Sequence, residues 1–288
     1  MLRYAVIIPA HNEAAFLPQM LTSLAAQTHL PVQAIVVDDH STDATGSIAQ
    51  QFVSEHNWLR VVRHESEARN IPGSKVIKAF HFGFSQLSVE WDVIVKLDAD
   101  LVLPPHYFER VVRHFSEDEK AGIVGGVASI EKNGSWVIEK LTDPDHVRGA
   151  LKAYRKACFE AIGGLRAAMG WDTADELLAR YHGWSVVAIP ELIVRHLKPT
   201  GAVYDASARF KQGEAFYALG YDYTLTLIAS LKLALRKNKP ALAADYLRGF
   251  MAAKKNRIPK LVSPAEQKFV RQYRWRKIRE KLFGTTSI

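Results

Sequence analysis

Apolar runs rich in β-branched residues alternate with helical patterns over about the first 115 residues of the chain. Strands are predicted at residues 4–9, 34–37, 59–62 and 93–97, and a helical pattern of apolar side chains accompanies them. This order and spacing are typical of βαβ units, which build a parallel sheet covered by helices on both faces. The sequence therefore predicts an α/β fold with a mostly parallel sheet flanked by helices.

The pattern becomes mixed after Gly122 and is helical from Arg209 to the end of the chain. The elements predicted between these points are strands at 123–130 and 184–189 and helices at 150–162 and 172–181.

Positive charge is concentrated at the C-terminal end. Residues 231–288 hold 16 Lys and Arg against 3 Asp and Glu, a local charge of +13, whereas the whole chain carries +8. Basic residues interleaved with aromatic ones, as at 271–277, suit the anionic interface of a membrane. We expect this helical tail to attach to an anionic membrane surface. The alternatives are an appendage packed on the rest of the chain and a dimer arm, which would make a homo-oligomer. No recognised nucleic-acid motif is present, so no nucleic-acid partner is expected.

Cysteine usage and hydropathy bear on the compartment. The single cysteine, Cys158, excludes an internal disulfide framework and is typical of a reducing compartment. The apolar run at 4–9 is too short for a signal peptide, and no run reaches the roughly 18 apolar residues of a spanning helix. We expect a cytoplasmic protein. If its tail attaches to the membrane, the protein would be peripheral at the inner face of the cell membrane.

Polar clusters follow three of the predicted strands, at residues 9–13, 38–43 and 98–100. In a parallel sheet, ligands bind beyond the carboxyl ends of the strands, so the three clusters share one edge. Adjacent carboxylates such as Asp38 and Asp39 are costly unless they accept hydrogen bonds or face a ligand. A divalent ion between Asp100 and a diphosphate would neutralise a leaving group. Taken singly, each cluster is more simply explained as a polar, acidic or helix-capping turn.

Together, residues 6–13 (VIIPAHNE), 36–43 (VVDDHSTD) and 97–100 (LDAD) resemble the motifs of family 2 glycosyltransferases, which have the Rossmann-like GT-A fold. The resemblance covers about residues 4–200. It implies an inverting transferase that uses a nucleotide-diphospho-sugar and Mg²⁺ or Mn²⁺. The donor-binding residues it implies are Pro9, Asn12, Glu13, Asp38, Asp39, Lys75, Asp98 and Ala99, and the metal ligands are Asp100 and His196. A hydrogen-bonded histidine at a strand end is the alternative for His196.

An inverting transferase needs a general base that removes the proton of the acceptor hydroxyl. In the family this base is usually the Asp of a Glu-Asp pair, which is absent here. Counting back from Gly183 by the family's usual spacing gives Asp172, whereas matching an Asp-Glu-Leu sequence gives Asp175 or Glu176. We take Asp172 and Asp175 as the catalytic candidates. The alternative is that these acids only stabilise the first turn of an exposed helix.

The resemblance also implies a domain organisation. Residues 1–205 would be a catalytic domain, with a nucleotide-sugar-binding half at about 1–120 and an acceptor half at about 121–205, and 206–288 would be the basic helical region. The expected acceptor is a saccharide or a lipid-linked molecule in the synthesis of a surface polysaccharide. A sugar-phosphate nucleotidyltransferase is a second hypothesis, but residues 9–12 (PAHN) replace its glycine-rich loop. A non-catalytic nucleotide-binding scaffold is the third, and the acids at 98 and 100 argue against it.

Overall fold

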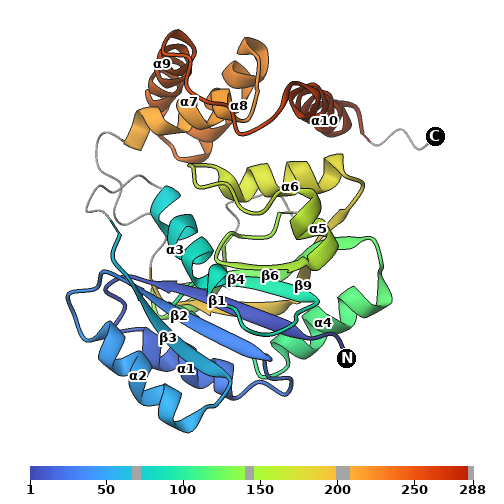
Figure 1. Ribbon diagram of the computed structural model, residues 1–288. Coiled ribbons are helices and arrows are strands. Elements are labelled where there is room, and N and C mark those ends of the chain that lie inside the picture. Colours follow the sequence, from blue (N-terminus) through green and yellow to red (C-terminus); the bar gives the residue numbers. More distant parts are fainter. Residues whose placement is uncertain (67–72, 140–145, 199–207, 285–288) are drawn as a thin grey trace.

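The computed structural model describes residues 1–66, 73–139, 146–198 and 208–284. Within them, a nine-stranded mixed sheet runs in the order β3–β2–β1–β4–β8–β6–β9–β5, with β7 paired to β6 (Figure 1). The strands are β1 (Tyr4–Ala10), β2 (Gln33–Asp39), β3 (Leu59–His64), β4 (Val93–Leu97), β5 (Leu101–Val102), β6 (Ala121–Lys132), β7 (Ser135–Ile138), β8 (Leu151–Arg155) and β9 (Ser185–His196).

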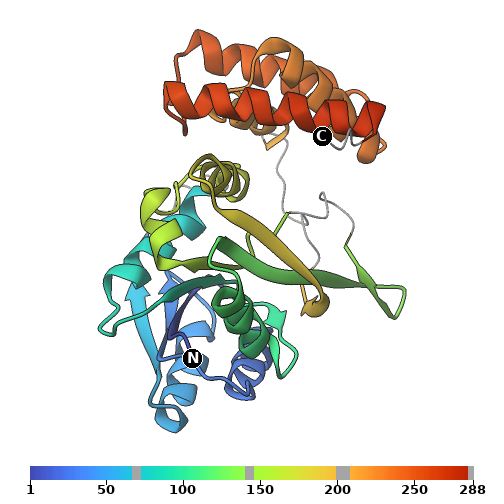
Figure 2. The same cartoon turned by 90° about the vertical axis from the view of Figure 1, so that its right-hand side faces the viewer.

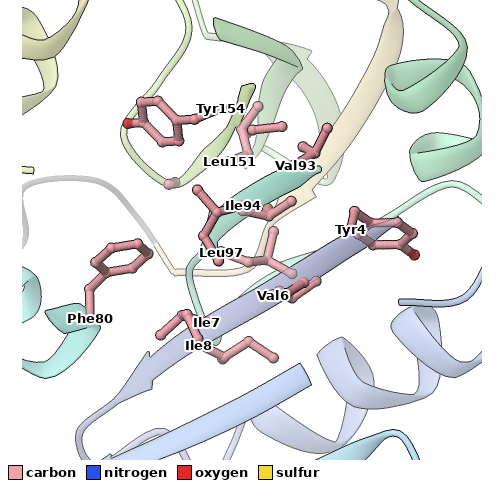
Figure 3. Packing of buried hydrophobic residues seen from close by; sticks show 14 of the residues in the cluster. Tyr4, Val6, Ile7, Ile8, Phe80, Val93, Ile94, Leu97, Leu151 and Tyr154 are labelled. Carbon is pink, nitrogen blue, oxygen red and sulfur yellow. The ribbon is translucent and has the colours of Figure 1, made fainter. Parts of the chain in front are cut away.

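The N-terminal half of the sheet is parallel, as predicted, because helices return the chain after its strands. The helices of this half are α1 (Leu17–Ala25), α2 (Thr45–Glu55), α3 (Ser74–Ser85) and α4 (Tyr107–Glu117). Their apolar faces enclose the buried side chains of β1 and β4, among them Ile7 and Ile94 (Figure 3). Phe80 of α3 is fully buried here, and a side chain of this kind stabilises the fold by roughly 1.5–3 kcal/mol.

One segment was predicted wrongly. Residues 150–162 were expected to be a helix, but the structure has strand β8 followed by the short helix α5 (Lys156–Ala161). Strand β8 pairs antiparallel with both β4 and β6, so hydrogen bonds are made along both of its edges. Leu151 and Ala153 are buried, and so are Lys152 and Tyr154, which alternate with them. Burial on both faces removes the apolar–polar alternation by which a strand is recognised.

The C-terminal helices form a second layer over helix α6 (Trp171–Tyr181), on the side of α6 away from the sheet (Figure 2). They share an apolar cluster with α6 that includes Ala174, Leu177, Phe216 and Tyr273. The helices of this layer are α7 (Ala208–Ala218), α8 (Tyr223–Arg236), α9 (Leu242–Lys255) and α10 (Pro264–Phe283).

A proline marks the beginning of the last helix, and glycines allow two others to pack closely. Pro264 is the first residue of α10, where its missing N–H costs nothing, and Ser263 and Glu266 form a capping box around it. Helices α7 and α9 cross closely because each has a glycine at the contact. A Cβ on Gly213 would collide with the backbone of Tyr246, so this position requires glycine. In the described ranges, no helix has both the length and the hydropathy to span a bilayer.

Candidate active site

The turns after β1 and β2 are bound to each other. The backbone N–H of Asn12 donates to Ser41 Oγ (3.0 Å), and Asn12 Oδ1 accepts from the N–H of Thr42 (2.8 Å). The N–H of Glu13 donates to Thr45 Oγ1 (2.8 Å). The backbone of Asn12 has a φ of 55°, a left-handed conformation that asparagine tolerates better than most residues. The first two sequence clusters therefore form one continuous surface at the carboxyl ends of β1 and β2.

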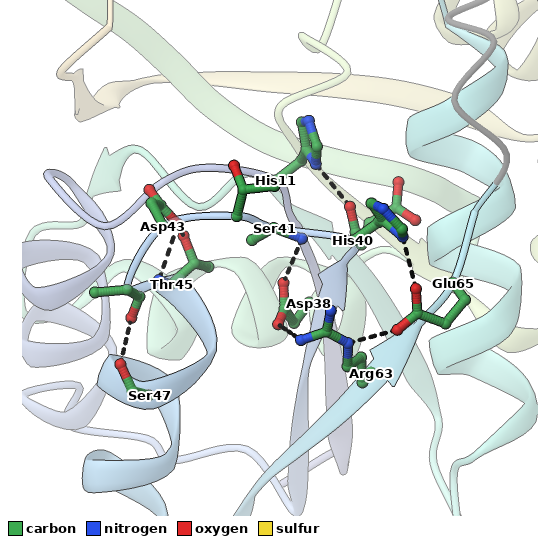
Figure 4. Close-up of polar contacts among 12 residues, drawn as sticks. His11, Asp38, His40, Ser41, Asp43, Thr45, Ser47, Arg63 and Glu65 are labelled. Carbon is green, nitrogen blue, oxygen red and sulfur yellow. Dashed lines mark hydrogen bonds and ion pairs between the residues drawn. The ribbon is translucent and has the colours of Figure 1, made fainter.

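The two adjacent carboxylates at the end of β2 are both buried. Asp38 Oδ1 accepts from the N–H of Ser41 (3.1 Å), and its Oδ2 lies 3.8 Å from Arg63 Nη1 (Figure 4). Asp39 Oδ1 lies 2.8 Å from His64 Nδ1, and its Oδ2 lies 3.8 Å from Lys75 Nζ at the start of α3. Asp38 thus closes the turn, whereas Asp39 joins the strand end to Lys75.

Glu13 connects this surface with the end of β9. Its Oε1 accepts a hydrogen bond from Nζ of Lys198, just beyond that strand (2.9 Å). Its Oε2 is buried and has no hydrogen-bond partner among the described residues. Burial raises the pKa of Glu13, and the charges of Asp100 and Asp98 raise it further, although Lys198 opposes them. The acids of the first and third sequence clusters therefore lie close enough to interact.

Asp100 and His196 are brought together by strand pairing. Strand β5 begins directly after Asp100 and runs antiparallel to the end of β9, which sets Leu101 opposite His196. As a result, His196 Nε2 lies 3.2 Å from Asp100 Oδ2, and both side chains are only 9% exposed. Asp98 behaves differently: it is 31% exposed and forms an ion pair with Lys96.

The pair fits a divalent metal. Asp100 Oδ1 and His196 Nδ1 are buried without a hydrogen-bond partner in the described part of the chain, although buried polar atoms are normally paired. A carboxylate with an imidazole is a donor set that suits Mn²⁺. Over the same ranges, no group of three or more His, Cys, Asp or Glu side chains could hold a metal. Sites with one or two protein ligands are completed by water and substrate phosphates.

Asp172 lies in the first turn of α6 and is partly exposed. Its neighbourhood also holds the guanidinium of Arg148. Burial lowers the pKa of Arg148, while the charges of Asp172, Asp98 and Asp100 raise it, in that order. Arg148 forms an ion pair with Glu139, and its guanidinium also interacts electrostatically with these three acids. The charge of Asp172 therefore acts on the same guanidinium as the charges of the Asp-x-Asp turn.

Asp175 and Glu176, one turn further along α6, are bound by the chain itself. Lys152 Nζ lies 2.8 and 3.0 Å from the two oxygens of Asp175, and the Tyr154 hydroxyl donates to Oδ2 (2.5 Å). Glu176 lies 3.1 Å from both Lys152 Nζ and His146 Nδ1. Burial disfavours ionisation of Glu176, but the charge of Lys152 and the hydrogen bond from His146 lower its pKa to about 2. Of the three acids on α6, Asp172 is the one whose side chain is partly exposed.

Pro9 and Ala99 are buried within the sheet edge, so their side chains shape it without presenting a polar group.

Sequence reasoning missed three cations of the site, Lys96, Lys152 and His64. For the two lysines, the available signal was a charged residue inside an otherwise apolar run. Lys96 lies 5.4 Å from the centre of the Trp171 ring, and Lys152 lies 5.8 Å from it.

Solved structures share this architecture. A mannosyltransferase from Pyrobaculum calidifontis, solved with GDP-Man and Mn²⁺, superposes with a TM-score of 0.59 at 17% identity, covering 96% of this chain and 80% of that one. TarS of S. aureus (residues 1–349), solved with UDP-GlcNAc, superposes with a TM-score of 0.57 at 17% identity, covering 87% and 73%. The chain thus has a GT-A-like α/β fold.

The model of glycosyl transferase family 2 matches residues 5–162. This chain therefore belongs to glycosyl transferase family 2, a family of enzymes. It is 27% identical over 169 residues to an uncharacterized glycosyltransferase of Nostoc sp., covering 57% of this chain and 50% of the relative. It is 32% identical over 137 residues to the undecaprenyl-phosphate 4-deoxy-4-formamido-L-arabinose transferase of Pseudomonas savastanoi, covering 46% and 37%. The matches span about half or less of these curated relatives.

Proposed function

We propose that this chain is an inverting glycosyltransferase that moves a sugar from a nucleotide-diphospho-sugar to an acceptor hydroxyl. The observation that carries the proposal is the pairing of Asp100 with His196, two buried side chains whose remaining metal-binding atoms have no hydrogen-bond partner among the described residues. Asp172 and Asp100 also act electrostatically on the same guanidinium, that of Arg148. A metal on one side and a carboxylate base on the other are what displacement of a diphosphate by a hydroxyl requires.

The nucleotide would lie over the joined turns after β1 and β2, where Pro9, Asn12 and Asp38 shape the surface. Asp39 is positioned to accept hydrogen bonds from the base or the ribose. Lys75, 3.8 Å from Asp39, lies where it can contact ribose or phosphate.

Asp98 would contact the ribose or a phosphate, next to Ala99, and Glu13 lies across the same edge. Asp100 and His196 would hold Mg²⁺ or Mn²⁺, which supplies charge neutralisation for the departing diphosphate. Among the structural neighbours, the mannosyltransferase was solved with Mn²⁺.

Asp172 acts on the acceptor. Its carboxylate takes the proton of the acceptor hydroxyl while that oxygen bonds to the anomeric carbon and the bond to the diphosphate breaks on the opposite face. Arg148, which is paired with Glu139, also offsets part of the negative charge of Asp172 and of the Asp-x-Asp turn. Asp175 and Glu176 instead hold α6 on β8 through Lys152.

Release of nucleoside diphosphate tests the proposal. With Mn²⁺, we expect the chain to split at least one donor in a panel of UDP- and GDP-sugars, slowly with water alone as acceptor. Asp100→Ala should reduce the rate at least about 100-fold, since it removes charge stabilisation of the leaving group. Exposed Glu117→Ala on α4 is the control and should behave as wild type. Nucleotide binding without release from any donor would favour the scaffold hypothesis, and formation of nucleotide-sugar from sugar phosphate would favour the nucleotidyltransferase.

For the location of the enzyme, we propose attachment to an anionic membrane through α8. The side chains of Tyr223, Leu227, Leu231 and Leu235 recur every four residues and are exposed, Leu235 to 66%. Lys254 of α9 donates to the Tyr223 hydroxyl (2.7 Å), so basic groups border this stripe. A lipid surface complements both the apolar side chains and the charge of +13. A second copy of the chain fits less well, because a symmetric contact would bring two basic surfaces together.

Flotation with vesicles tests the attachment. We expect the protein to float with phosphatidylglycerol-containing vesicles and not with phosphatidylcholine alone, less so at high salt. Combined Leu231→Gln and Leu235→Gln should abolish most of the binding, whereas Leu282→Gln, an equally exposed leucine on α10, should not. Equal flotation of the double variant and wild type would refute the proposal, as would a dimer in solution that the double variant abolishes.

A further inference from the structure

Lys96 is a charged side chain in the interior of the sheet. It lies in β4, is 2% exposed, and stands directly opposite Lys152 of β8 in the strand register. A buried ammonium group is costly, and like charges on directly opposite residues of paired strands add to that cost. Each of the two lysines therefore needs a compensating acid.

The two lysines find their acids in different places. The ammonium group of Lys152 binds Asp175 and Glu176, which are both buried and hold α6 on the sheet. In the part of the chain that the structure describes, the one acid paired with Lys96 is Asp98, whose side chain is 31% exposed. Asp98 accepts through Oδ1, which leaves Oδ2 for a ligand. The ion pair of Lys96 thus connects the interior of the sheet with the exposed Asp-x-Asp turn.

Trp171 covers both lysines. The centre of its ring lies 5.4 Å from Nζ of Lys96 and 5.8 Å from Nζ of Lys152, within the range at which the face of an indole attracts a cation. The Trp171 side chain is itself buried, so it shields the ammonium group of Lys96 from water. The attraction between Lys96 and Asp98 is stronger there than on an open surface. Lys96 is therefore well placed to fix the carboxylate of Asp98.

The backbone holds Asp98 from a second side. The N–H of Asp98 donates to the carbonyl of Ala150 (2.8 Å). The preceding residue, Gly149, packs against the beginning of α6, and a Cβ on it would lie only 3.1 Å from Cβ of Asp172. With its N–H bound by Ala150 and its Oδ1 bound by Lys96, Asp98 has a defined position relative to Asp172.

We propose that Lys96 is a positioning residue for the donor: it holds Oδ1 of Asp98 so that Oδ2 accepts a hydrogen bond from a ribose hydroxyl of the nucleotide. The inference rests on the proposed transferase activity, which supplies the nucleotide. A hydroxyl fits this oxygen because a carboxylate accepts hydrogen bonds, whereas it repels phosphate. Lys96 is buried and acts through Asp98. A carboxylate that is fixed in advance loses less freedom on binding, so the donor binds more tightly.

Calorimetric titration of the full chain in the presence of Mn²⁺ tests the inference. The probes are UDP and GDP, each compared with its 2′,3′-dideoxy analogue, which lacks the ribose hydroxyls. For the nucleotide that binds, we expect the wild type to prefer the ribose form at least about tenfold, the usual scale for a charged hydrogen bond. Lys96→Met fills the space without the charge and should lose most of this preference. A purely structural role of Lys96 would change stability and leave the preference intact.

Asp98→Ala removes the acceptor itself and should lose the same preference, so either variant decides if the other does not fold. Because Lys96 acts through Asp98, the double variant should lose no more than Asp98→Ala. Lys120→Met, which removes an exposed lysine just before β6, is the matched control and should bind as wild type.

Three results would overturn the inference: a wild type that binds both forms equally, a folded Lys96→Met or Asp98→Ala variant that keeps the preference, or losses that add in the double variant. Failure of the wild type to bind either UDP or GDP would instead refute the proposed function.

Discussion

Asp172→Asn is expected to reduce the rate of sugar transfer by about 10²–10⁴-fold, which is the usual contribution of a general base. The slower hydrolysis of the donor by water should fall by a similar factor. Asparagine keeps the size of the side chain but cannot take a proton. Binding of nucleoside diphosphate and Mn²⁺ should be unchanged, because the proposed donor contacts come from the ends of β1 and β2 and from the Asp-x-Asp turn. The measurement pairs the rate of nucleoside diphosphate release with a binding titration on the same preparation.

Asp175→Asn is the informative comparison, because it makes the same change three residues away on the same helix. Asp175 is 3% exposed and bound by Lys152 and Tyr154. The Asp175→Asn variant should therefore be less stable than wild type, while its folded molecules keep most of their turnover rate. If Asp172→Asn keeps the wild-type rate while folded Asp175→Asn loses it, the base has been assigned to the wrong residue.

Lys152→Met is expected to lower the free energy of unfolding by about 3–5 kcal/mol at neutral pH, the cost of leaving a buried charge without its partner. The Lys152 side chain is fully buried, and its ammonium group binds the carboxylates of Asp175 and Glu176. Methionine fills the space and removes the charge. Urea unfolding measures the loss. Lys156→Met is the control: this lysine is 43% exposed with Glu90 3.8 Å away, so its loss should cost no more than about 1 kcal/mol.

The pH dependence of the Lys152→Met variant follows from the same contacts. In the wild type, Lys152 helps to lower the pKa of Glu176 to about 2, against the effect of burial. Burial already raises the pKa of Asp175 to about 6 in the wild type, against the effect of Lys152. Without the lysine charge, we expect the pKa of Asp175 to rise further and that of Glu176 to rise above its unfolded value. Their protonated forms are then favoured in the folded state, so the variant should regain stability as the pH falls toward about 5. A deficit that grows with acidification would contradict this role of Lys152.

The strands of the N-terminal half could be predicted because their β-branched runs end at polar turns. Their shared edge followed from parallel topology alone, which is why residues 9–13, 38–43 and 98–100 could be expected to meet. The pairing of β5 with β9 could not be predicted. It joins residues 96 positions apart through a two-residue strand, too short for any periodicity. The resemblance to the family, not the pattern, is what suggested His196.

The choice among the acids of α6 was also beyond the sequence. Asp172, Asp175 and Glu176 stand at i, i+3 and i+4, so they lie on one side of the helix and spacing does not separate them. Strand β8 distinguishes them. Its Lys152 binds both Asp175 and Glu176, and its Tyr154 binds Asp175. That strand was itself predicted as a helix, so the partners of Asp175 were not recognised.

We propose that acids from separate loops gather around a cation that holds a diphosphate. Calorimetric titration of the wild-type chain with UDP and GDP, with and without Mn²⁺, tests it most directly. We predict that Mn²⁺ tightens binding of one of them by at least about tenfold, and that Asp100→Ala removes this gain without removing the weak metal-free binding. Equal affinity with and without Mn²⁺, or a gain that survives in Asp100→Ala, would contradict the account.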